Sequence, residues 1–225
     1  MRRAVPAARH HRRAGGVTAV AEPDLPSRLA ALGTATIGEV APQARLFGPG
    51  LHPVQPGRAF AGPAATVRCA PGDNLALHRA IARLAPGEVL VVDYANSLES
   101  GPFGEIMALA CQMRGCAGLV TNGAVRDLAR LRDSGFGVVA RGAAIRGTTK
   151  ADPGELGVPI TLAGTTVAPG DLVVADDDAV LALSPDGLGA VLSAAEARQA
   201  KEEEMMRRLR AGETTLRIMG LEERD

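Results

Sequence analysis

Three ionisable residues lie close to glycine-containing segments and have the side chains of a reactive site. The segment 101–107 runs from a glycine-punctuated loop into the start of a predicted helix, and it contains Glu105. Twenty residues after Glu105 come Arg126 and Asp127, just past a predicted strand and turn. Ligand sites in α/β sheets gather beyond the carboxyl ends of strands. We therefore expect the two segments to meet at one edge of a sheet.

The chemistry of this set is that of an electrophilic site for a 2-keto acid. Asp127 and Glu105 offer carboxylate oxygens, which suit Mg²⁺ or Mn²⁺ when waters complete the coordination. Arg126 can hold a carboxylate or stabilise an enolate, and free N–H groups at a helix N-terminus attract anions. Together these groups fit a 2-keto acid whose C–C bond is cleaved to an enolate. The alternative is a surface salt bridge of Arg126, with Glu105 as a favourable charge at a helix N-terminus.

The composition excludes several other classes of site and partner. There is no Walker loop, dinucleotide-binding glycine motif or nucleophile elbow. The three cysteines lack zinc spacing, and Cys111 and Cys116 are best explained as core residues. One Tyr, no Trp and a net charge of zero argue against nucleic acid. No apolar run approaches the roughly 20 residues of a membrane span, and the cysteine usage favours a reducing, cytoplasmic location.

The zero net charge conceals an uneven distribution. Residues 1–16 hold five arginines and no acidic residue, so the rest of the chain has an excess of acidic groups. Without hydrophobic periodicity, we interpret residues 1–22 as a disordered basic arm. The arm is either an extended start of the chain or a segment for an anionic partner. Residues 23–225 are expected to form a single domain.

The elements that must position the candidate site alternate between strands and helices. Apolar, β-branched runs predict strands at 64–69, 88–93, 117–121 and 137–140. Helical spacing predicts helices within 24–47 and at 73–84, 104–114 and 125–134, with a loop at 48–57 and a turn at 122–123. Closely spaced antiparallel strands are predicted at 158–163, 165–167, 171–175 and 179–183, before a long helix at 188–210 and a tail at 212–225. The class is α/β with mixed sheets and external helices.

At these residues the sequence resembles a known family. An acidic residue, twenty residues and then Arg-Asp is the pattern of the 4-hydroxy-4-methyl-2-oxoglutarate aldolases and the related regulator of ribonuclease activity A (RraA-like) proteins. Further segments are similar over roughly residues 28–220: Gly33-Thr34-Ala35-Thr36-Ile37, Pro71-Gly72-Asp73-Asn74-Leu75, Arg114-Gly115-Cys116-Ala117-Gly118-Leu119-Val120, Arg146-Gly147-Thr148-Thr149-Lys150, Ala168-Pro169-Gly170-Asp171-Leu172-Val173 and Leu209-Arg210-Ala211-Gly212-Glu213.

The resemblance implies a fold, an assembly and an activity. The fold would be a compact, layered α/β sandwich of the swivelling β/β/α type, with a long C-terminal helix. The assembly would be a homotrimer or a hexamer with the active site between subunits. The activity would be metal-dependent (class II) aldol cleavage of 4-hydroxy-4-methyl-2-oxoglutarate or 4-carboxy-4-hydroxy-2-oxoadipate to pyruvate, together with decarboxylation of oxaloacetate. The partner would be a small 2-keto acid, with no nucleic acid and no membrane.

The resemblance also implies roles for individual residues. Asp127 would ligate Mg²⁺ or Mn²⁺, Glu105 would act through a water on the metal, and Arg126 would stabilise the pyruvate enolate. The substrate carboxylate would be held by backbone amides near Gly104, Ile106 and Met107. An acidic residue from the C-terminal helix of a neighbouring subunit, for which Glu202 is our candidate, would complete the site.

Two departures from the family pattern bear on the substrate. The aldolases commonly have an acidic residue three positions after the metal-binding aspartate, where this chain has Arg130. The loop after the strand at 88–93 commonly carries glycines, where this chain reads Tyr94-Ala95-Asn96-Ser97-Leu98-Glu99. Two alternatives therefore stay open, namely a non-catalytic protein that binds a ribonuclease and a relative recruited to another 2-keto acid C–C lyase or hydratase step.

Overall fold

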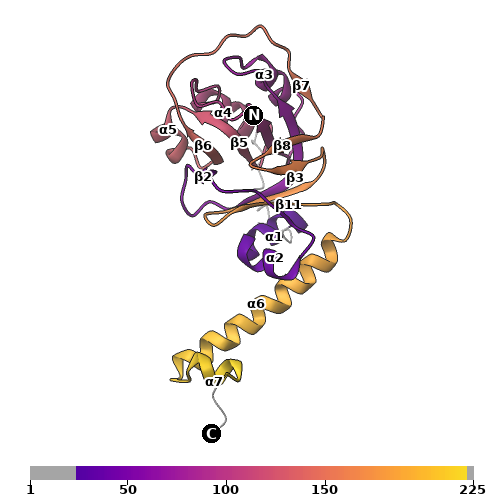
Figure 1. The fold of residues 1–225 in the computed structure, drawn as a ribbon, viewed down its shortest axis with the longest axis vertical. Coiled ribbons are helices and arrows are strands. Elements are labelled where there is room, and N and C mark those ends of the chain that lie inside the picture. Colours follow the sequence, from indigo (N-terminus) through magenta and orange to yellow (C-terminus); the bar gives the residue numbers. More distant parts are fainter. Residues whose placement is uncertain (1–23, 222–225) are drawn as a thin grey trace, which may run out of the picture.

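The computed structural model describes residues 24–221 of the 225-residue chain (Figure 1). The basic arm predicted for residues 1–22 lies outside the described residues. Across residues 24–221, no helix is both long enough and apolar enough to cross a membrane.

A nine-stranded mixed sheet forms the centre of the fold. Its path runs β1-β11-β10-β3-β4-β5-β6-β2, and β7 lies beside β3. The strands are β1 (Arg45–Leu46), β2 (His52–Pro53), β3 (Phe60–Arg68), β4 (Val89–Asp93), β5 (Gly118–Val125), β6 (Gly137–Ala143), β7 (Glu155–Leu156), β10 (Leu172–Ala175) and β11 (Val180–Leu183). Residues 60–63 of β3 pair antiparallel with β10, and residues 64–68 pair parallel with β4. The mixed sheet predicted from the sequence is confirmed.

Side-chain alternation along the parallel strands divides the core between two layers. Leu90 and Val92 of β4 pack with the helices α3 (Leu75–Ile81), α4 (Glu105–Met113) and α5 (Leu128–Asp133). Val89 and Val91 face the opposite side, where they pack with the antiparallel part of the sheet and the hairpin of β8 (Ile160–Leu162) and β9 (Thr165–Val167). Because successive residues of a strand point to opposite faces, a continuous apolar strand is buried on both. The layers are therefore helices, sheet and hairpin, as expected for the sandwich (Figure 1).

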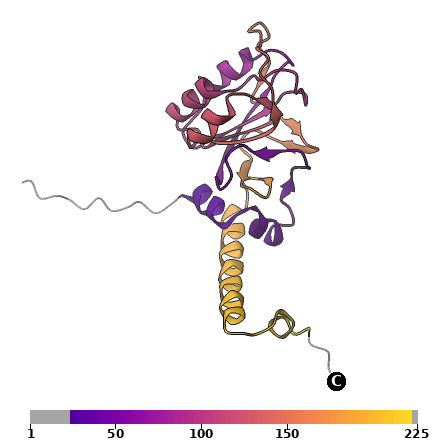
Figure 2. The ribbon, with the colours of Figure 1, turned by 90° about the vertical axis from the view of Figure 1, so that its left-hand side faces the viewer.

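The terminal helices form a third group beneath the sheet. α1 (Leu25–Leu32), α2 (Thr34–Val40) and the first part of α6 (Leu188–Arg210) enclose a separate apolar cluster with β10 and β11. The rest of α6 projects away from the body and leads to α7 (Thr215–Met219) at its far end (Figure 2). The long helix is confirmed, whereas the predicted tail contains the helix α7.

Two sequence predictions near the candidate site are wrong. The expected turn at Asn122-Gly123 lies inside β5, which is continuous and shifts register between Thr121 and Ala124. Asn122 is held there by a hydrogen bond from the Tyr94 N–H to its Oδ1 at 2.6 Å. The expected helix over 125–134 begins only at Leu128, because the strand continues to Val125 and Asp127 adopts a left-handed conformation with φ of 59°.

One smaller expectation also changed, because the predicted loop over 48–57 contains the short strand β2, which pairs with β6. At the start of α3 the Asn74 side chain makes no capping hydrogen bond, whereas Asp73 Oδ1 accepts one from the Leu75 N–H at 2.9 Å. The cysteines agree with the core interpretation, since Cys69, Cys111 and Cys116 are all buried free thiols.

Candidate functional site

The structure brings the two predicted segments together at the ends of two parallel strands. Phe103, at the end of the loop that follows β4, forms a parallel bridge with Val125 at the end of β5. The Arg126 N–H continues this pairing by donating to the Phe103 carbonyl at 2.9 Å. Glu105 and Asp127 therefore lie side by side, although 22 positions separate them in the chain.

Asp127 is the central ionisable group of this arrangement. Its Oδ2 accepts a hydrogen bond from the Glu105 backbone N–H at 3.1 Å and lies 3.7 Å from Arg126 Nε. The Arg126 and Asp127 side chains are 42% and 41% exposed, so solvent and small ligands can reach both. A carboxylate, a guanidinium and the N-terminus of α4 thus share one accessible position.

Glycine is required where these segments touch. A Cβ on Gly104 would lie 2.3 Å from Asp127 Oδ2 and 2.8 Å from Arg126 Cγ. A Cβ on Gly101 would lie 2.2 Å from the Ala144 carbonyl oxygen. All three distances are far below van der Waals contact, so the close approach of the loop to the segments that follow β5 and β6 depends on the missing side chains.

The first turn of α4 supplies the backbone groups expected to bind a carboxylate. The first four N–H groups of a helix have no partner within the helix, and that of Glu105 is taken by Asp127. The N–H groups of Ile106 and Met107 follow. The Ile106 side chain is 79% exposed while that of Met107 is buried, so the first turn lies at the surface and is anchored from below.

Two residues that the sequence analysis gave no site role fix the surrounding loops. Asn74 Nδ2 donates to the Pro102 carbonyl at 3.0 Å, two residues before Gly104. Asp73 Oδ2 accepts from Thr149 Oγ1 at 2.6 Å and from the Ala151 N–H at 2.7 Å. Burial acts to raise the pKa of Asp73, but the hydrogen bonds from Thr149, Ala151 and Leu75 outweigh it and hold the pKa well below its ordinary value. The only sequence signal for this role was the segment Pro71-Gly72-Asp73-Asn74.

Two carboxylates at this position could hold a divalent cation. Within residues 24–221, no group of three or more His, Cys, Asp or Glu side chains is placed to hold a metal ion. Asp127 and Glu105 are therefore the carboxylates that one protomer offers at this position. Mg²⁺ is commonly bound through one or two carboxylates and keeps several waters, so the two residues fit such an ion.

The remaining candidate, Glu202, lies apart from this group, and Arg130, a departure from the family pattern, lies at its edge. Glu202 is on α6, where Arg198 Nη2 contacts its Oε1 at 3.0 Å, and α6 extends from the body on the side away from α4 and α5 (Figure 1). One protomer therefore does not bring Glu202 to Asp127. Arg130 is on α5 and lines a hollow of about 290 Å³ together with Glu105 and Asp133.

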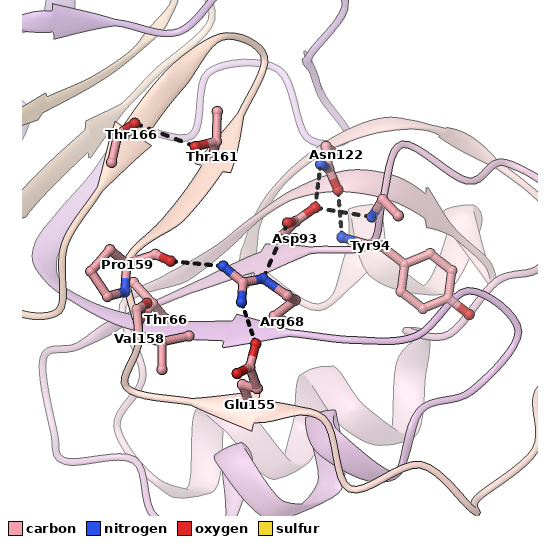
Figure 3. Close-up of polar contacts among 11 residues, drawn as sticks. Thr66, Arg68, Asp93, Tyr94, Asn122, Glu155, Val158, Pro159, Thr161 and Thr166 are labelled. Atoms are coloured by element: carbon pink, nitrogen blue, oxygen red, sulfur yellow. Dashed lines mark hydrogen bonds and ion pairs between the residues drawn. The ribbon is translucent and has the colours of Figure 1, made fainter.

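A second polar cluster lies at the ends of β3 and β4 and beside the irregular part of β5 (Figure 3). Asp93 Oδ1 accepts from Asn122 Nδ2 at 2.8 Å and from the Ala95 N–H at 3.0 Å. Arg68 donates to Glu155 and to the Pro159 carbonyl, and its Nε lies 3.9 Å from Asp93 Oδ2. These side chains bind one another, so the cluster joins β3, β4, β5 and β7.

Comparison with known proteins agrees with this fold. Two curated relatives carry the provisional name 4-hydroxy-4-methyl-2-oxoglutarate aldolase. The one from Burkholderia multivorans is 40% identical over 137 residues, covering 61% of this chain and 83% of the relative. The one from Halalkalibacterium halodurans is 33% identical over 153 residues, covering 68% of this chain and 73% of the relative.

A solved structure shows the same relationship. The RNA-processing inhibitor RraA from Thermus thermophilis aligns with a TM-score of 0.64 and 31% identity, covering 68% of this chain and 94% of that structure. The family described as RraA-like (Aldolase/RraA) matches residues 34–182, which include β1 to β10, most of β11 and the whole Glu105–Asp127 arrangement. This chain belongs to the RraA-like family.

Proposed function

We propose that this protein is a divalent-metal-dependent C–C lyase that cleaves 2-keto acids to pyruvate. The observation that carries the proposal is the contact of Asp127 Oδ2 with the Glu105 N–H, with Arg126 Nε 3.7 Å away. The names of the two curated relatives support a lyase. The proposed substrates are 4-hydroxy-4-methyl-2-oxoglutarate or 4-carboxy-4-hydroxy-2-oxoadipate for aldol cleavage and oxaloacetate for decarboxylation.

The residues of the chain would divide the work of binding and charge stabilisation. The N–H groups of Ile106 and Met107 would hold the 2-keto acid carboxylate at the positive end of α4. Arg126 would stabilise the negative charge that develops on the C2 oxygen as the C3–C4 bond breaks. Both reactions leave the same enolate, so one arrangement of donors serves both.

A metal ion and a proton acceptor complete the proposal. Asp127, with Glu105, would hold Mg²⁺ or Mn²⁺, which when bound supplies a Lewis acid for the keto oxygen. Aldol cleavage also removes the proton of the C4 hydroxyl group, whereas decarboxylation has no such proton to remove. The Glu105 carboxylate, at the same end of α4, is the group that we assign to this proton.

One experiment tests the reaction class. Pyruvate release from each substrate is measured with Mg²⁺, with Mn²⁺ and with a chelator, for the wild type, Asp127→Asn and the control Asp186→Asn, an exposed carboxylate in the turn before α6. We expect activity that is lost with chelator and falls at least about 100-fold in Asp127→Asn, while the control stays near wild type. Activity that survives both treatments would overturn the mechanism. No turnover together with ribonuclease binding would favour the non-catalytic alternative.

We also propose that the site is completed in a homotrimer or hexamer. Ile106, Leu109 and Met113 form an exposed apolar row along α4, and the far end of α6 with α7 exposes Met206, Leu209, Leu216 and Met219. Apolar surface of this kind is typical of contacts between subunits. The mass of the protein in solution tests the assembly. Leu209→Asp should lower this mass and the exposed control Ala197→Asp should not. A monomeric wild type contradicts the proposal.

A further inference from the structure

Tyr94 is a buried aromatic residue at the start of the loop that leads to the site. It follows β4 directly, in the loop where the resembled family commonly carries glycines, and its side chain is fully buried. Its hydroxyl oxygen accepts a hydrogen bond from the Gly72 N–H at 2.8 Å and lies 3.0 Å from Ser100 Oγ. Packing in the core accounts for the apolar ring of Tyr94. It does not account for the two polar contacts of the hydroxyl group.

The ring is held in one place by the strand beside it. The Tyr94 N–H donates to Asn122 Oδ1 at 2.6 Å, and Figure 3 shows the ring extending away from this contact. A Cβ on Gly123 would lie 2.7 Å from Tyr94 Cβ and 3.0 Å from the ring. The irregular part of β5 therefore fits against Tyr94, and the hydroxyl group is a fixed point.

The hydroxyl group contacts the two segments that determine the position of the first N–H groups of α4. Gly72 begins the turn that leads to Asn74, and Asn74 Nδ2 holds the Pro102 carbonyl. Ser100, only 2% exposed, precedes Gly101, whose N–H donates to the Arg146 carbonyl at 3.0 Å. One oxygen atom thus connects the 72–74 turn with the 100–104 segment just before the start of α4.

We propose that Tyr94 is a positioning residue whose phenolic hydroxyl aligns the 100–104 segment, and with it the first N–H groups of α4, against Arg126. The kinetic consequence rests on the proposed function, since it concerns the binding of the substrate carboxylate. The structural consequence does not, because it concerns only the protection of backbone N–H groups. Tyr94 has no contact with substrate in this scheme and acts through the loop.

The test compares Tyr94→Phe with Thr66→Val as a matched control. Thr66 is 2% exposed and donates through Oγ1 to the Val158 carbonyl at 2.7 Å, so the control also removes one buried hydroxyl group and its hydrogen bond. We expect both variants to lower Tm by a similar few degrees, about 2–5 °C. Ser100→Ala removes the other hydroxyl partner and serves as a second variant should Tyr94→Phe fold poorly.

Two measurements separate the outcomes. For Tyr94→Phe and Ser100→Ala we expect KM for oxaloacetate to rise about fivefold with kcat nearly unchanged, and amide exchange at the hydrogen-bonded N–H groups of Gly101 and Glu105 to quicken about tenfold. Thr66→Val should change neither. Equal KM and equal exchange in wild type and Tyr94→Phe, or the same changes in Thr66→Val, would overturn the proposal. If the wild type turns over no 2-keto acid, the proposed function fails and the exchange measurement alone decides the role of Tyr94.

Discussion

The backbone N–H of Glu105 donates to Oδ2 of Asp127 at 3.1 Å, which joins the first residue of α4 to the residue that precedes α5. The bond fixes the Asp127 carboxylate relative to the helix N-terminus. In this position Asp127 has a left-handed backbone conformation, with φ of 59°, that non-glycine residues seldom adopt. Such conformations persist where the surroundings enforce them and gather at functional sites.

The Glu105–Asp127 contact predicts a severe effect of Gly104→Ala. The added Cβ would meet Asp127 Oδ2 at 2.3 Å and Arg126 Cγ at 2.8 Å, so the carboxylate and the guanidinium must both move. We expect kcat/KM for oxaloacetate to fall at least about 100-fold, since misplacement by an ångström can cost that much. Steady-state kinetics measure this loss of activity, and a thermal melt measures any loss of stability separately.

Gly38→Ala in α2 is the control for that substitution. A Cβ on Gly38 meets nothing within 4 Å, and alanine is favoured over glycine inside a helix by up to about 1 kcal/mol. Gly38→Ala should keep full activity and melt at the same temperature or slightly higher. Wild-type kinetics in Gly104→Ala would mean that the Asp127 position is unimportant.

Local sequence was sufficient where local physics decides. The run at β4, Val-Leu-Val-Val, is apolar at every position because both of its faces are covered, and it was predicted as a buried strand. The 23 residues of α6 form a helix rich in Ala, Glu and Arg, and their bounds were predicted closely. The spacing from Glu105 to Arg126 indicated two segments at neighbouring strand ends.

Long-range contacts explain what sequence could not show. Asn122-Gly123 has the composition of a turn, yet two hydrogen bonds of the Asn122 side chain keep it in β5. It accepts one from the Tyr94 N–H and donates one to Asp93, 28 and 29 positions away. The anchoring of Asp73 by Thr149 spans 76 positions and has no local signature. Contacts between residues so distant in the chain depend on the finished topology, so no pattern along the chain predicts them.

Aldol cleavage and decarboxylation should respond differently to Glu105→Gln. The backbone N–H of residue 105, which holds Asp127, is unaffected by the change. The side chain loses its basic carboxylate, which in the proposal takes the proton and helps Asp127 to hold the metal. Removing a positioned base typically costs 10²–10⁴-fold in rate. We therefore expect aldol cleavage of 4-hydroxy-4-methyl-2-oxoglutarate to fall at least about 100-fold, and decarboxylation of oxaloacetate to fall less than about tenfold.

The two substrates act as controls for each other in the Glu105→Gln enzyme. Preserved decarboxylation shows that the metal, Arg126 and the amide groups still operate. Pyruvate is measured in both assays at saturating Mg²⁺, so that a weaker metal affinity does not enter the comparison. An equal loss of both activities would assign Glu105 to the metal site alone and remove its role with the proton.

The acid sensitivity of the fold should depend on Asp73. Burial acts to raise the pKa of Asp73, but the bonds from Thr149, Ala151 and Leu75 hold the folded-state pKa below the ordinary value of 3.8. Because the folded state thus binds the proton more weakly than the unfolded state, Asp73 stabilises the fold above about pH 4 and loses this contribution as the pH falls further. Urea unfolding at pH 5, 4, 3 and 2.5 is the measurement. We expect Asp73→Asn to be less stable than the wild type at pH 5, with the difference narrowing steadily toward pH 2.5.

Asp178→Asn, at an exposed carboxylate, is the control and should follow the wild type throughout. A constant difference in stability between Asp73→Asn and the wild type across this pH range would show that ionised Asp73 does not stabilise the loop over 144–151.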